Sequence, residues 1–303
     1  MKAAQFARFG GPEVLEIVDL PDPHPGPGQV RIVVHAAGIS ATDPKIRKGE
    51  LNFGRGLPQT TGADVAGIVD ELGEGVSDVA VGDRVFGVSD DGAGAAELAR
   101  LSYRTIMPSS LGFVDAAALP VALETATRGL DQLGVARGRT LFINGASGGI
   151  GSTAVQLAVA RGARVIGAAS AANQGYLGLL GAEPVTYGEG MVERVRALAP
   201  GGVDVALDVA GNGVLPELID LAGSAKNVVT LADFDGAKEH DVHFSNGFVD
   251  GHAFHALADV GDLIDTGQFW LPVERTFPLA NIAEAHRVSE AGRVRGRLVL
   301  VVR

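Results

Sequence analysis

The sequence predicts an α/β protein that combines a β-rich domain with a doubly wound parallel sheet. Three observations support this fold class. Residues 139–170 read as strand, glycine turn, helix and strand, further strands and helices alternate up to about residue 250, and the first third holds short apolar strands between glycine turns. Alternating strands and helices are typical of a parallel sheet. Short strands with frequent turns indicate a compact, barrel-like domain.

The first third is expected to form strands with one short helix. Residues 1–6 and 15–20 predict two strands that pair around the turn near Gly10. The other elements expected here are a strand at 30–36, a polar turn at 38–43, a helical turn at 44–48, a strand at 65–72, and a turn at 81–87 that leads into another strand.

The composition changes at residue 115, where an alanine- and leucine-rich helix is expected over 115–134. The strands predicted for the parallel sheet lie at 139–144, 164–169, 184–186, 203–208 and 227–231. After about residue 250 we expect a helix at 256–265, a strand at 273–277, a helix at 282–291 and a strand at 297–302. The final strand would most simply rejoin the first domain. The predicted domains are therefore residues 1–115 with 256–303, and residues 116–255.

Length and composition exclude several classes of function. A chain of 303 residues that is 46% hydrophobic and 20% charged is an ordinary two-domain globular composition. The net charge of −11 argues against nucleic acid or an anionic membrane as the main partner. The absence of cysteine excludes disulfides, thiolate chemistry and Cys-ligated metal sites. Without a long apolar run or a signal-peptide core, the expected location is the cytoplasm.

The glycine-rich turn at residues 145–149 is the strongest local signal. The helix over 150–160 that follows it is expected to bury Ile150, Ala154, Leu157 and Ala158, and Gly162 stands where a C-cap glycine would. A helix that starts at such a turn can hold a pyrophosphate on its backbone N–H groups. The dinucleotide fingerprint would place glycines at 146, 148 and 151, and only position 146 departs from it, by one methyl group. The flanking strand, helix and strand favour dinucleotide binding over a plain tight turn.

The end of the second strand indicates which dinucleotide is bound. An NAD-selective site usually has Asp or Glu there, and that carboxylate would repel a 2′-phosphate. Here the strand ends in Ala169 and Ser170, followed by Asn173 and Gln174. These small or neutral groups accept a phosphate, so NADPH is favoured over NADH. No Lys or Arg occurs between Ser170 and Tyr187, so a cationic partner must come from elsewhere in the fold.

Seven motifs, in this order, carry a resemblance to a known family. They are GISATD at 38–43, GADVAG at 62–67, VGDRV at 81–85, LPVALETA at 119–126, GASGGIG at 145–151, LGA at 180–182 and GRLVL at 296–300. Together they resemble the medium-chain dehydrogenase/reductase superfamily, specifically its zinc-free quinone oxidoreductase branch. The resemblance implies a GroES-like catalytic domain at 1–115 and 256–303, a Rossmann NADPH-binding domain at 116–255, and a homodimer.

Departures from the zinc-dependent members narrow the expected reaction. Zinc alcohol dehydrogenases have Cys at the position of Ser40 and a His-Glu pair at Ala63 and Asp64, and a hydroxyl and a methyl group cannot replace thiolate and imidazole ligands. We therefore expect no metal site and no zinc to polarise an alcohol. The resemblance implies hydride transfer from NADPH to a small electrophilic molecule, either a quinone or an α,β-unsaturated carbonyl compound. The alternative is an NADPH-binding structural or regulatory protein with little turnover.

The same resemblance assigns roles to individual residues. In the catalytic turn, Ser40 would hydrogen-bond the substrate oxygen beside Asp43, and Lys45 would stabilise the enolate or relay a proton. The alternative interpretation is that Asp43 holds its own turn and Lys45 is solvated. The expected cofactor contacts are Thr125 near the nicotinamide, Ser147, Gly148, Gly149 and Ile150 at the pyrophosphate, Ser170, Gln174 and Tyr187 at the 2′-phosphate, and Val209, Leu231 and Ala232 along the crevice. Apart from the resemblance, Arg293 and Arg295 could supply the missing positive charge from the C-terminal segment.

Two other interpretations are weaker. A short-chain reductase needs a Tyr-x-x-x-Lys pair, and Met107, Leu180 and Met191 stand four residues after the three tyrosines. Four histidines have a spacing that resembles metal ligands, but no shared helix is predicted for them, so solvated or interface histidines are favoured: His240, His243, His252 and His255. The expected substrate loops, at 51–58 and 246–255, carry no recognisable selectivity residues.

Overall fold

The computed structural model describes residues 1–51 and 54–303, and its chain divides into two compact units. The first unit comprises Met1–Val121, Leu257–Thr266 and Trp270–Arg303, and the second comprises Ala122–Ala256 and Gly267–Phe269. The first unit thus extends to Val121 rather than to residue 115, because the short helix α2 (Phe113–Ala116) packs against strands β3 and β5. Within the described ranges, no helix is long and apolar enough to cross a membrane.

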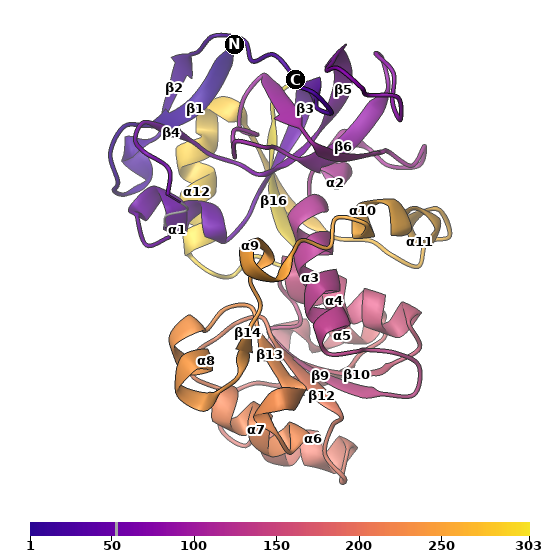
Figure 1. Ribbon diagram of the computed structural model, residues 1–303. Helices are drawn as coiled ribbons and strands as arrows, with labels where there is room; N and C mark the ends of the chain where they lie inside the picture. Colours follow the sequence, from indigo (N-terminus) through magenta and orange to yellow (C-terminus); the bar gives the residue numbers. More distant parts are fainter. Residues whose placement is uncertain (52–53) are drawn as a thin grey trace. The chain divides into compact units, whose positions relative to one another are not determined.

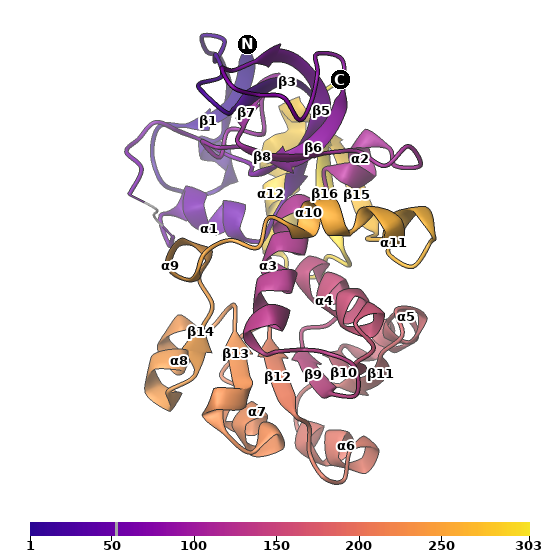
Figure 2. The ribbon, with the colours of Figure 1, turned by 45° about the vertical axis from the view of Figure 1, so that its right-hand side comes forward.

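The first unit is built from two sheets whose strands are mostly antiparallel (Figure 2). One sheet has the order β2 (Glu16–Asp19), β1 (Lys2–Phe6) and β4 (Gln59–Thr60). The other has the order β15 (Val273–Pro278), β16 (Arg297–Val301), β3 (Val30–Ile39), β5 (Asp64–Leu72), β6 (Arg84–Val88) and β8 (Tyr103–Ile106), while β7 (Leu98–Leu101) also pairs with β3. The helices of this unit are η1 (Pro12–Val14), α1 (Thr42–Lys48), α2, α11 (Gly261–Asp265), η4 (Leu279–Asn281) and α12 (Ile282–Glu290).

Two pairings of the first unit confirm expectations from the sequence. Strands β1 and β2 are antiparallel, with Lys2 opposite Asp19. Strand β16 returns from the C-terminal part of the chain and pairs antiparallel with β3, with Leu298 opposite Ile39. The apolar residues of β1, β3 and β16 form one buried core with α12, to which Ile282 and Ala285 contribute.

The second unit is a doubly wound parallel sheet (Figure 1). Its strand order is β11 (Glu183–Thr186), β10 (Arg164–Ala169), β9 (Thr140–Asn144), β12 (Val205–Asp208), β13 (Val228–Thr230) and β14 (His243–Phe244), and all neighbours are parallel. In chain order this is 3-2-1-4-5-6, the Rossmann arrangement. The order reverses between β9 and β12, and that switch point is where such sheets bind dinucleotides.

Helices cover both faces of the parallel sheet because successive strand residues point to opposite sides. Leu141 and Ile143 face the core formed with α3 (Pro120–Gln132), α4 (Gly149–Ala160) and α5 (Gln174–Leu179). Phe142 faces the core formed with α6 (Met191–Leu198), α7 (Leu215–Ala222) and α8 (Phe234–His240). The remaining helices are the short turns η2 (Ala171–Asn173), η3 (Ala225–Asn227) and α9 (Gly247–Asp250), and α10 (Ala256–Asp259) at the boundary of the units.

Three details differ from the sequence prediction. The helix expected over 115–134 is divided into α2 and α3, because Pro120 starts α3 and a proline disfavours helical backbone at the residue before it. The helix expected over 256–265 is divided into α10 and α11. On α4, Ala154 and Ala158 are buried as expected and Val155 is buried as well, whereas Ile150 and Leu157 are only partly buried.

Candidate functional site

The glycine turn leaves the start of α4 uncapped. Strand β9 ends at Asn144, and Gly145 then adopts φ +83°, a conformation that favours glycine. Gly148 is the N-cap residue of α4 and has no side chain to bond the first N–H groups, while the N–H of Ser152 donates to its carbonyl at 2.8 Å. The N–H groups of Gly149 and Ile150 precede this first helical bond. This arrangement can hold an anion such as a pyrophosphate.

Gly151 allows α4 to approach the turn closely. A Cβ atom at this position would collide with the carbonyl oxygen of Gly145 and lie 2.8 Å from the Cα atom of Ala146. Ala146, which replaces the first glycine of the fingerprint, is fully buried, and its N–H donates to the carbonyl of Ala168 at 2.9 Å. The extra methyl group is therefore accommodated in the core, and the turn keeps its shape.

A buried network joins the carboxyl ends of three neighbouring strands at the switch point. Asp208, at the end of β12, accepts from the Asn144 amide at 2.9 Å and from the Thr230 hydroxyl at 2.7 Å. Its carboxylate also accepts from the backbone N–H groups of Ala210 and Gly211 at 3.1 and 2.9 Å. These side chains are not among the residues predicted for the site, although each occupies the last position of an apolar strand.

This network fixes the residues that were predicted to line the crevice. Val209 follows Asp208 directly and is partly buried. Thr230 Oγ1 accepts from the backbone N–H of Ala232 at 3.2 Å, so it shapes the loop that also carries the partly buried Leu231. The predicted residues Val209, Leu231 and Ala232 thus lie together at the carboxyl edge of the sheet.

The residues predicted for the 2′-phosphate lie at the ends of β10 and β11. Ser170 follows β10 and is partly buried, and Tyr187 follows β11 and is exposed, with its N–H donating to the Ala169 carbonyl at 3.4 Å. The Gln174 amide donates to the carbonyls of Ala169, Ser170 and Val185 at 3.0 to 3.1 Å. Both donor hydrogens of Gln174 are therefore engaged with the backbone, so this side chain joins the two strand ends rather than presenting a donor to a phosphate.

Arg194 brings a cation to the same edge. From helix α6, its Nε and Nη2 atoms donate to the carbonyl of Thr186 at 3.1 and 2.9 Å, and Nη2 donates to Gly188 at 3.2 Å. The sequence predicted that a cation must come from outside residues 170–187, and Arg194 is such a residue because α6 returns it to the end of β11. Arg293 and Arg295 belong to the first unit and are exposed in the turn before β16.

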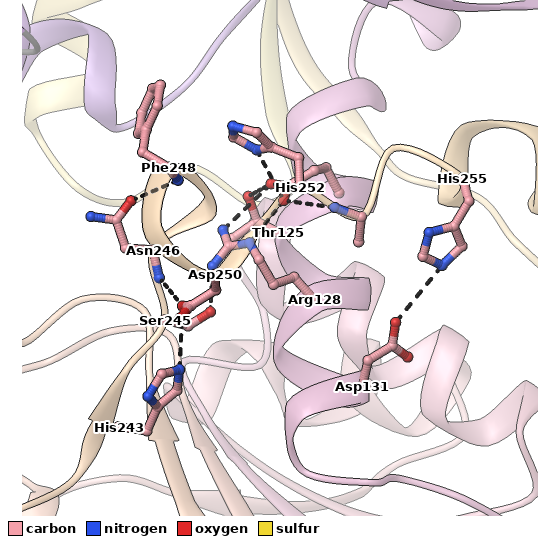
Figure 3. Close-up of polar contacts among 12 residues, drawn as sticks. Thr125, Arg128, Asp131, His243, Ser245, Asn246, Phe248, Asp250, His252 and His255 are labelled. Atoms are coloured by element: carbon pink, nitrogen blue, oxygen red, sulfur yellow. Dashed lines mark hydrogen bonds and ion pairs between the residues drawn. The ribbon is translucent and has the colours of Figure 1, made fainter.

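Thr125 belongs to a hydrogen-bonded cluster on α3 (Figure 3). Its hydroxyl donates to Glu124 Oε2 at 2.9 Å, and Arg128 Nε donates to Glu124 Oε1 at 2.8 Å. Arg128 also donates from Nη1 to the Ser245 hydroxyl, which links α3 to the segment after β14. Burial raises the pKa of Glu124, but the hydrogen bond and charge of Arg128 outweigh it and hold this pKa below its usual range. Glu124 is therefore a buried carboxylate that stays ionised.

The predicted pyrophosphate residue Ser147 lies within the turn and is partly buried. Its hydroxyl accepts from the Asn173 amide at 3.2 Å, so the glycine turn is tied to the segment that follows β10. The cofactor residues predicted in the second unit therefore share the carboxyl edge of one parallel sheet.

The predicted catalytic residues belong to the first unit, at the turn between β3 and α1. Asp43 is 5% exposed, and its carboxylate accepts from the backbone N–H and the hydroxyl of Ser40 at 2.7 and 3.0 Å. Ser40 Oγ in turn accepts from the N–H of Thr42 at 3.2 Å. Asp43 thus has the contacts of a residue that holds its own turn, and Lys45 is exposed.

Comparisons with known proteins agree with this geometry. Residues 26–120 match the family model described as the alcohol dehydrogenase GroES-like domain, and residues 180–300 match the model described as zinc-binding dehydrogenase. The quinone oxidoreductase of Rattus norvegicus is 31% identical in an alignment 325 residues long. This alignment covers 100% of this chain and 98% of the rat protein. This chain belongs to the medium-chain dehydrogenase/reductase superfamily. Within it, the chain is an oxidoreductase of the quinone oxidoreductase-like branch.

Solved structures of this superfamily share the whole fold. The quinone oxidoreductase of Coxiella burnetii is 32% identical with a TM-score of 0.86, covering 100% of this chain and 99% of that one. A mycobacterial protein described as complexed with NADPH is 27% identical with a TM-score of 0.82, and a protein described as an NAD-dependent alcohol dehydrogenase is 29% identical with a TM-score of 0.86. Each of these two covers 100% of both chains. The GroES-like and Rossmann expectations are thereby confirmed.

In this oxidoreductase, Asp64 takes part in a structural contact. It stands where zinc-dependent members have the acidic residue of their His-Glu pair, and its carboxylate pairs with the buried Arg297 and accepts from the Val121 N–H at 2.5 Å. Burial lowers the pKa of Arg297 to about 10. Both carboxylate oxygens of Asp64 are thus engaged in holding β5, β16 and the start of α3.

Three histidines of the 240–255 region contact three different carboxylates. The ring of His243 pairs with Asp250 at 3.2 Å, that of His255 with Asp131 at 3.7 Å, and that of His252 with Glu124 at 3.3 Å (Figure 3). His240 is the last residue of α8. In the part of the chain that the structure describes, no group of three or more His, Cys, Asp or Glu residues is arranged to hold a metal ion. The other predicted substrate loop spans residues 51–58. Its residues 52 and 53 lie outside the described ranges.

Proposed function

We propose that this oxidoreductase transfers a hydride from NADPH to a quinone or an α,β-unsaturated carbonyl compound without a zinc ion. The observation that carries the proposal is the uncapped start of α4 beside a β10 strand that ends without a carboxylate. NADPH, when bound, supplies the hydride from C4 of its nicotinamide. The protein's own residues hold the cofactor, orient the acceptor and exclude water.

The residues present fit the phosphate groups of the cofactor. The N–H groups of Gly149 and Ile150 would hold the pyrophosphate at the positive end of the α4 dipole. At the end of β10, Ser170 offers a hydroxyl where an NAD-selective site usually has an acidic side chain. Arg194 adds a positive charge beside Tyr187. Arg293 and Arg295 stay predictions, as possible sources of the positive charge that the chain lacks between Ser170 and Tyr187.

The nature of the acceptor follows from the positions that zinc ligands occupy in other members. Ser40 and Ala63 cannot ligate zinc as thiolate and imidazole do, and Asp64 is committed to Arg297. These positions therefore cannot hold a zinc ion as the Lewis acid that would polarise an isolated alcohol or carbonyl group. A quinone or conjugated enone is electrophilic without such help. The relatives named quinone oxidoreductase support this reaction over the NADPH-binding regulatory alternative.

The assay is the decrease of NADPH absorbance with a panel of quinones, 2-alkenals and cyclic enones. We expect turnover with at least one class, and a lower Kd for NADPH than for NADH in a titration. Tight binding of NADPH without turnover of any acceptor would contradict the reaction, and tighter binding of NADH would contradict the cofactor assignment. Sedimentation of the same sample tests the homodimer that the resemblance implies.

Arg194 offers a separate test of the cofactor assignment. If its guanidinium faces the 2′-phosphate, Arg194→Gln raises the Kd for NADPH about tenfold, since one charge-assisted contact is lost, and leaves the Kd for NADH unchanged. Arg196→Gln is the matched control, because Arg196 lies on the same helix but pairs with Asp220 in solvent. Equal effects of Arg194→Gln on both cofactors would show that Arg194 only holds the loop.

A further inference from the structure

We propose that His252, oriented by Glu124, donates the proton that completes reduction of the acceptor. The proposal rests on the proposed function and adds to it a histidine that was expected to be a solvated or interface residue. Three features of the second unit carry it: the pairing of His252 with a buried carboxylate, the packing of its ring, and its place at the carboxyl edge of the sheet.

The pairing fixes the orientation of the imidazole. His252 Nδ1 lies 3.3 Å from Glu124 Oε1, and the backbone N–H of the next residue, Ala253, donates to the same oxygen at 3.3 Å. An ionised carboxylate only accepts hydrogen bonds, so Nδ1 must carry a hydrogen. The other ring nitrogen, Nε2, is then the atom that can exchange a proton with a ligand. Figure 3 shows this second nitrogen turned away from α3.

The Glu124 carboxylate is itself held rigidly. It is 5% exposed, and Arg128 and Thr125 donate to it from the same helix. The other two histidine pairs of this region are different, because His255 and its partner Asp131 are 58% and 45% exposed, and His243 is 47% exposed. A buried carboxylate that orients an imidazole is the arrangement by which enzymes fix a histidine for proton transfer. A carboxylate that merely solvates a surface histidine does not need burial.

The ring of His252 is also fixed by packing. Phe254 stacks on it with ring centres 4.7 Å apart, and Phe248 meets it edge-on at 5.3 Å. Gly247 passes so close that a Cβ atom there would collide with Nδ1. The side chain nevertheless keeps 32% of its surface exposed. The imidazole is therefore in contact with both rings while remaining accessible to a small molecule.

The segment that carries His252 lies at the half of the sheet that serves the nicotinamide. It follows β14, and the N–H of Ser245 donates to the Thr230 carbonyl at 2.9 Å, beside the predicted crevice residue Leu231. In a Rossmann sheet the second group of three strands, here β12, β13 and β14, binds the nicotinamide half of the cofactor. Thr125, predicted to lie near the nicotinamide, donates to the same carboxylate that orients His252.

The chemistry of the reaction needs such a donor. Hydride addition to the β-carbon of an enone forms a C–H bond and moves the π electrons toward the carbonyl oxygen. The proton from Nε2 of the imidazolium then forms the α C–H bond or the enol O–H bond, and the ring returns to its neutral form with Nδ1–H still bonded to Glu124. One NADPH and one proton thus give NADP⁺ and the saturated carbonyl compound. A quinone becomes a hydroquinone by the same balance, and solvent restores the imidazolium.

The charged groups around His252 suit this role. Glu124 and Arg128 face it from α3, and Asp250 on its own segment is engaged with His243 and the N–H of Asn246. The carboxylate of Glu124 accepts the Nδ1 hydrogen whether or not Nε2 carries a proton, while Arg128 neutralises the charge of Glu124. Removing the ring should therefore affect the protonation step more than the binding of NADPH.

The test compares His252→Ala and His252→Gln with His255→Gln, a matched control on an exposed pair of the same segment. We expect kcat to fall about 100-fold in both His252 variants, the usual contribution of one general acid, with the Kd for NADPH within twofold of the wild-type value. Added imidazole should raise the activity of His252→Ala at least tenfold. His252→Gln retains an amide donor for Glu124, so its loss of activity separates proton transfer from loop packing.

The outcomes separate this inference from the proposed function. A wild-type enzyme that reduces an acceptor while both His252 variants keep kcat within threefold would overturn the role of His252 and leave the proposed function intact. The same holds if imidazole restores nothing to a folded His252→Ala that binds NADPH normally. A wild-type protein without turnover of any acceptor would overturn both.

Discussion

At the scale of single residues, the side chains that set the geometry of the candidate site are buried acids. Asp208 accepts hydrogen bonds from Asn144, Thr230 and the loop that begins with Ala210. Glu124 accepts hydrogen bonds from Thr125 and Arg128 and contacts the ring of His252. Each carboxylate satisfies several donors at once, so removing it leaves several polar groups unpaired in the interior. These acids therefore contribute both to stability and to the placement of the loops.

Asp208→Ala tests this at the switch point of the sheet. We expect the free energy of unfolding to fall by about 2–4 kcal/mol, because the amide of Asn144 and the hydroxyl of Thr230 lose their buried acceptor. Urea denaturation measures the change. Asp204→Ala is the control, because Asp204 accepts from the Thr140 N–H at the exposed opposite edge of the sheet. This variant should lower the free energy of unfolding by about 1 kcal/mol or less. Equal costs for the two variants would show that the network at the switch point is not special.

The residue scale is also where the sequence was least informative about the site. Glycines at 148 and 151 were predictable, because a tight turn before a helix has a recognisable spacing. Asp208 and Glu124 were not, since an acidic residue at the end of an apolar strand or inside a helix has no spacing that distinguishes a buried network from a solvated surface. Arg194 was missed for a related reason: its distance from Tyr187 is short in space only because α6 turns back toward β11.

At the scale of elements, most of the fold was predictable from apolar runs. Strands β9, β10, β12 and β13 are buried on both faces, and such strands appear in a sequence as continuous apolar stretches. Strand β14 was not predicted, because His243 and Phe244 are too few residues to show a period. The division of α2 from α3 depends on Pro120, a signal that the alanine- and leucine-rich pattern around it obscured.

The packing of α4 on the glycine turn leads to a prediction about one element. Gly151→Ala places a methyl group against the Gly145 carbonyl and the Ala146 backbone, neither of which can move without displacing the helix start. We expect the Kd for NADPH to rise at least tenfold and the free energy of unfolding to fall by about 2 kcal/mol. Calorimetric titration and urea denaturation measure the two effects.

Gly178→Ala supplies the control for this substitution. Gly178 lies in helix α5, and a Cβ atom there meets nothing within 4 Å. The same chemical change should stabilise the protein by about 0.5–1 kcal/mol, because alanine is the better helix former, and should leave NADPH binding unchanged. If Gly151→Ala behaves like Gly178→Ala, the close approach of α4 to the turn is not required for binding.

At the scale of the whole molecule, both units contain ionisable groups whose surroundings in the folded protein make stability depend on pH. Glu124 in the second unit and Glu290 in the first have pKa values held below the usual range: burial raises each pKa, but hydrogen bonds and charges from Arg128, and from Arg47 and Lys48, lower it further. Each contributes stability that is present above its ordinary pKa and is lost as the pH falls through the lowered value. Their effect is therefore confined to pH values below about 4.5.

His286 extends this pH dependence into a higher range. It is 1% exposed, and its Nδ1 accepts from Arg47 Nη1 at 3.3 Å, so the folded protein favours the neutral ring. Burial lowers its pKa from 6.5 to about 4; Asp43 and Glu290 oppose this shift, and the charge of Arg47 adds to it. Between these two values the unfolded chain binds a proton that the folded protein does not. Lowering the pH from 6.5 to 4 thus favours unfolding.

The resulting prediction concerns the stability curve of the intact protein. We expect the free energy of unfolding to fall by about 3 kcal/mol over this range on account of His286 alone. In His286→Gln, whose amide oxygen can still accept from Arg47, that part of the decline should disappear, so the urea midpoints of variant and wild type converge toward pH 4. His255→Gln, on an exposed ring, should keep the wild-type curve. If His286→Gln instead runs parallel to the wild type from pH 7 to 4, the buried ring is protonated in the folded state and the contact with Arg47 is not what sets the pH dependence.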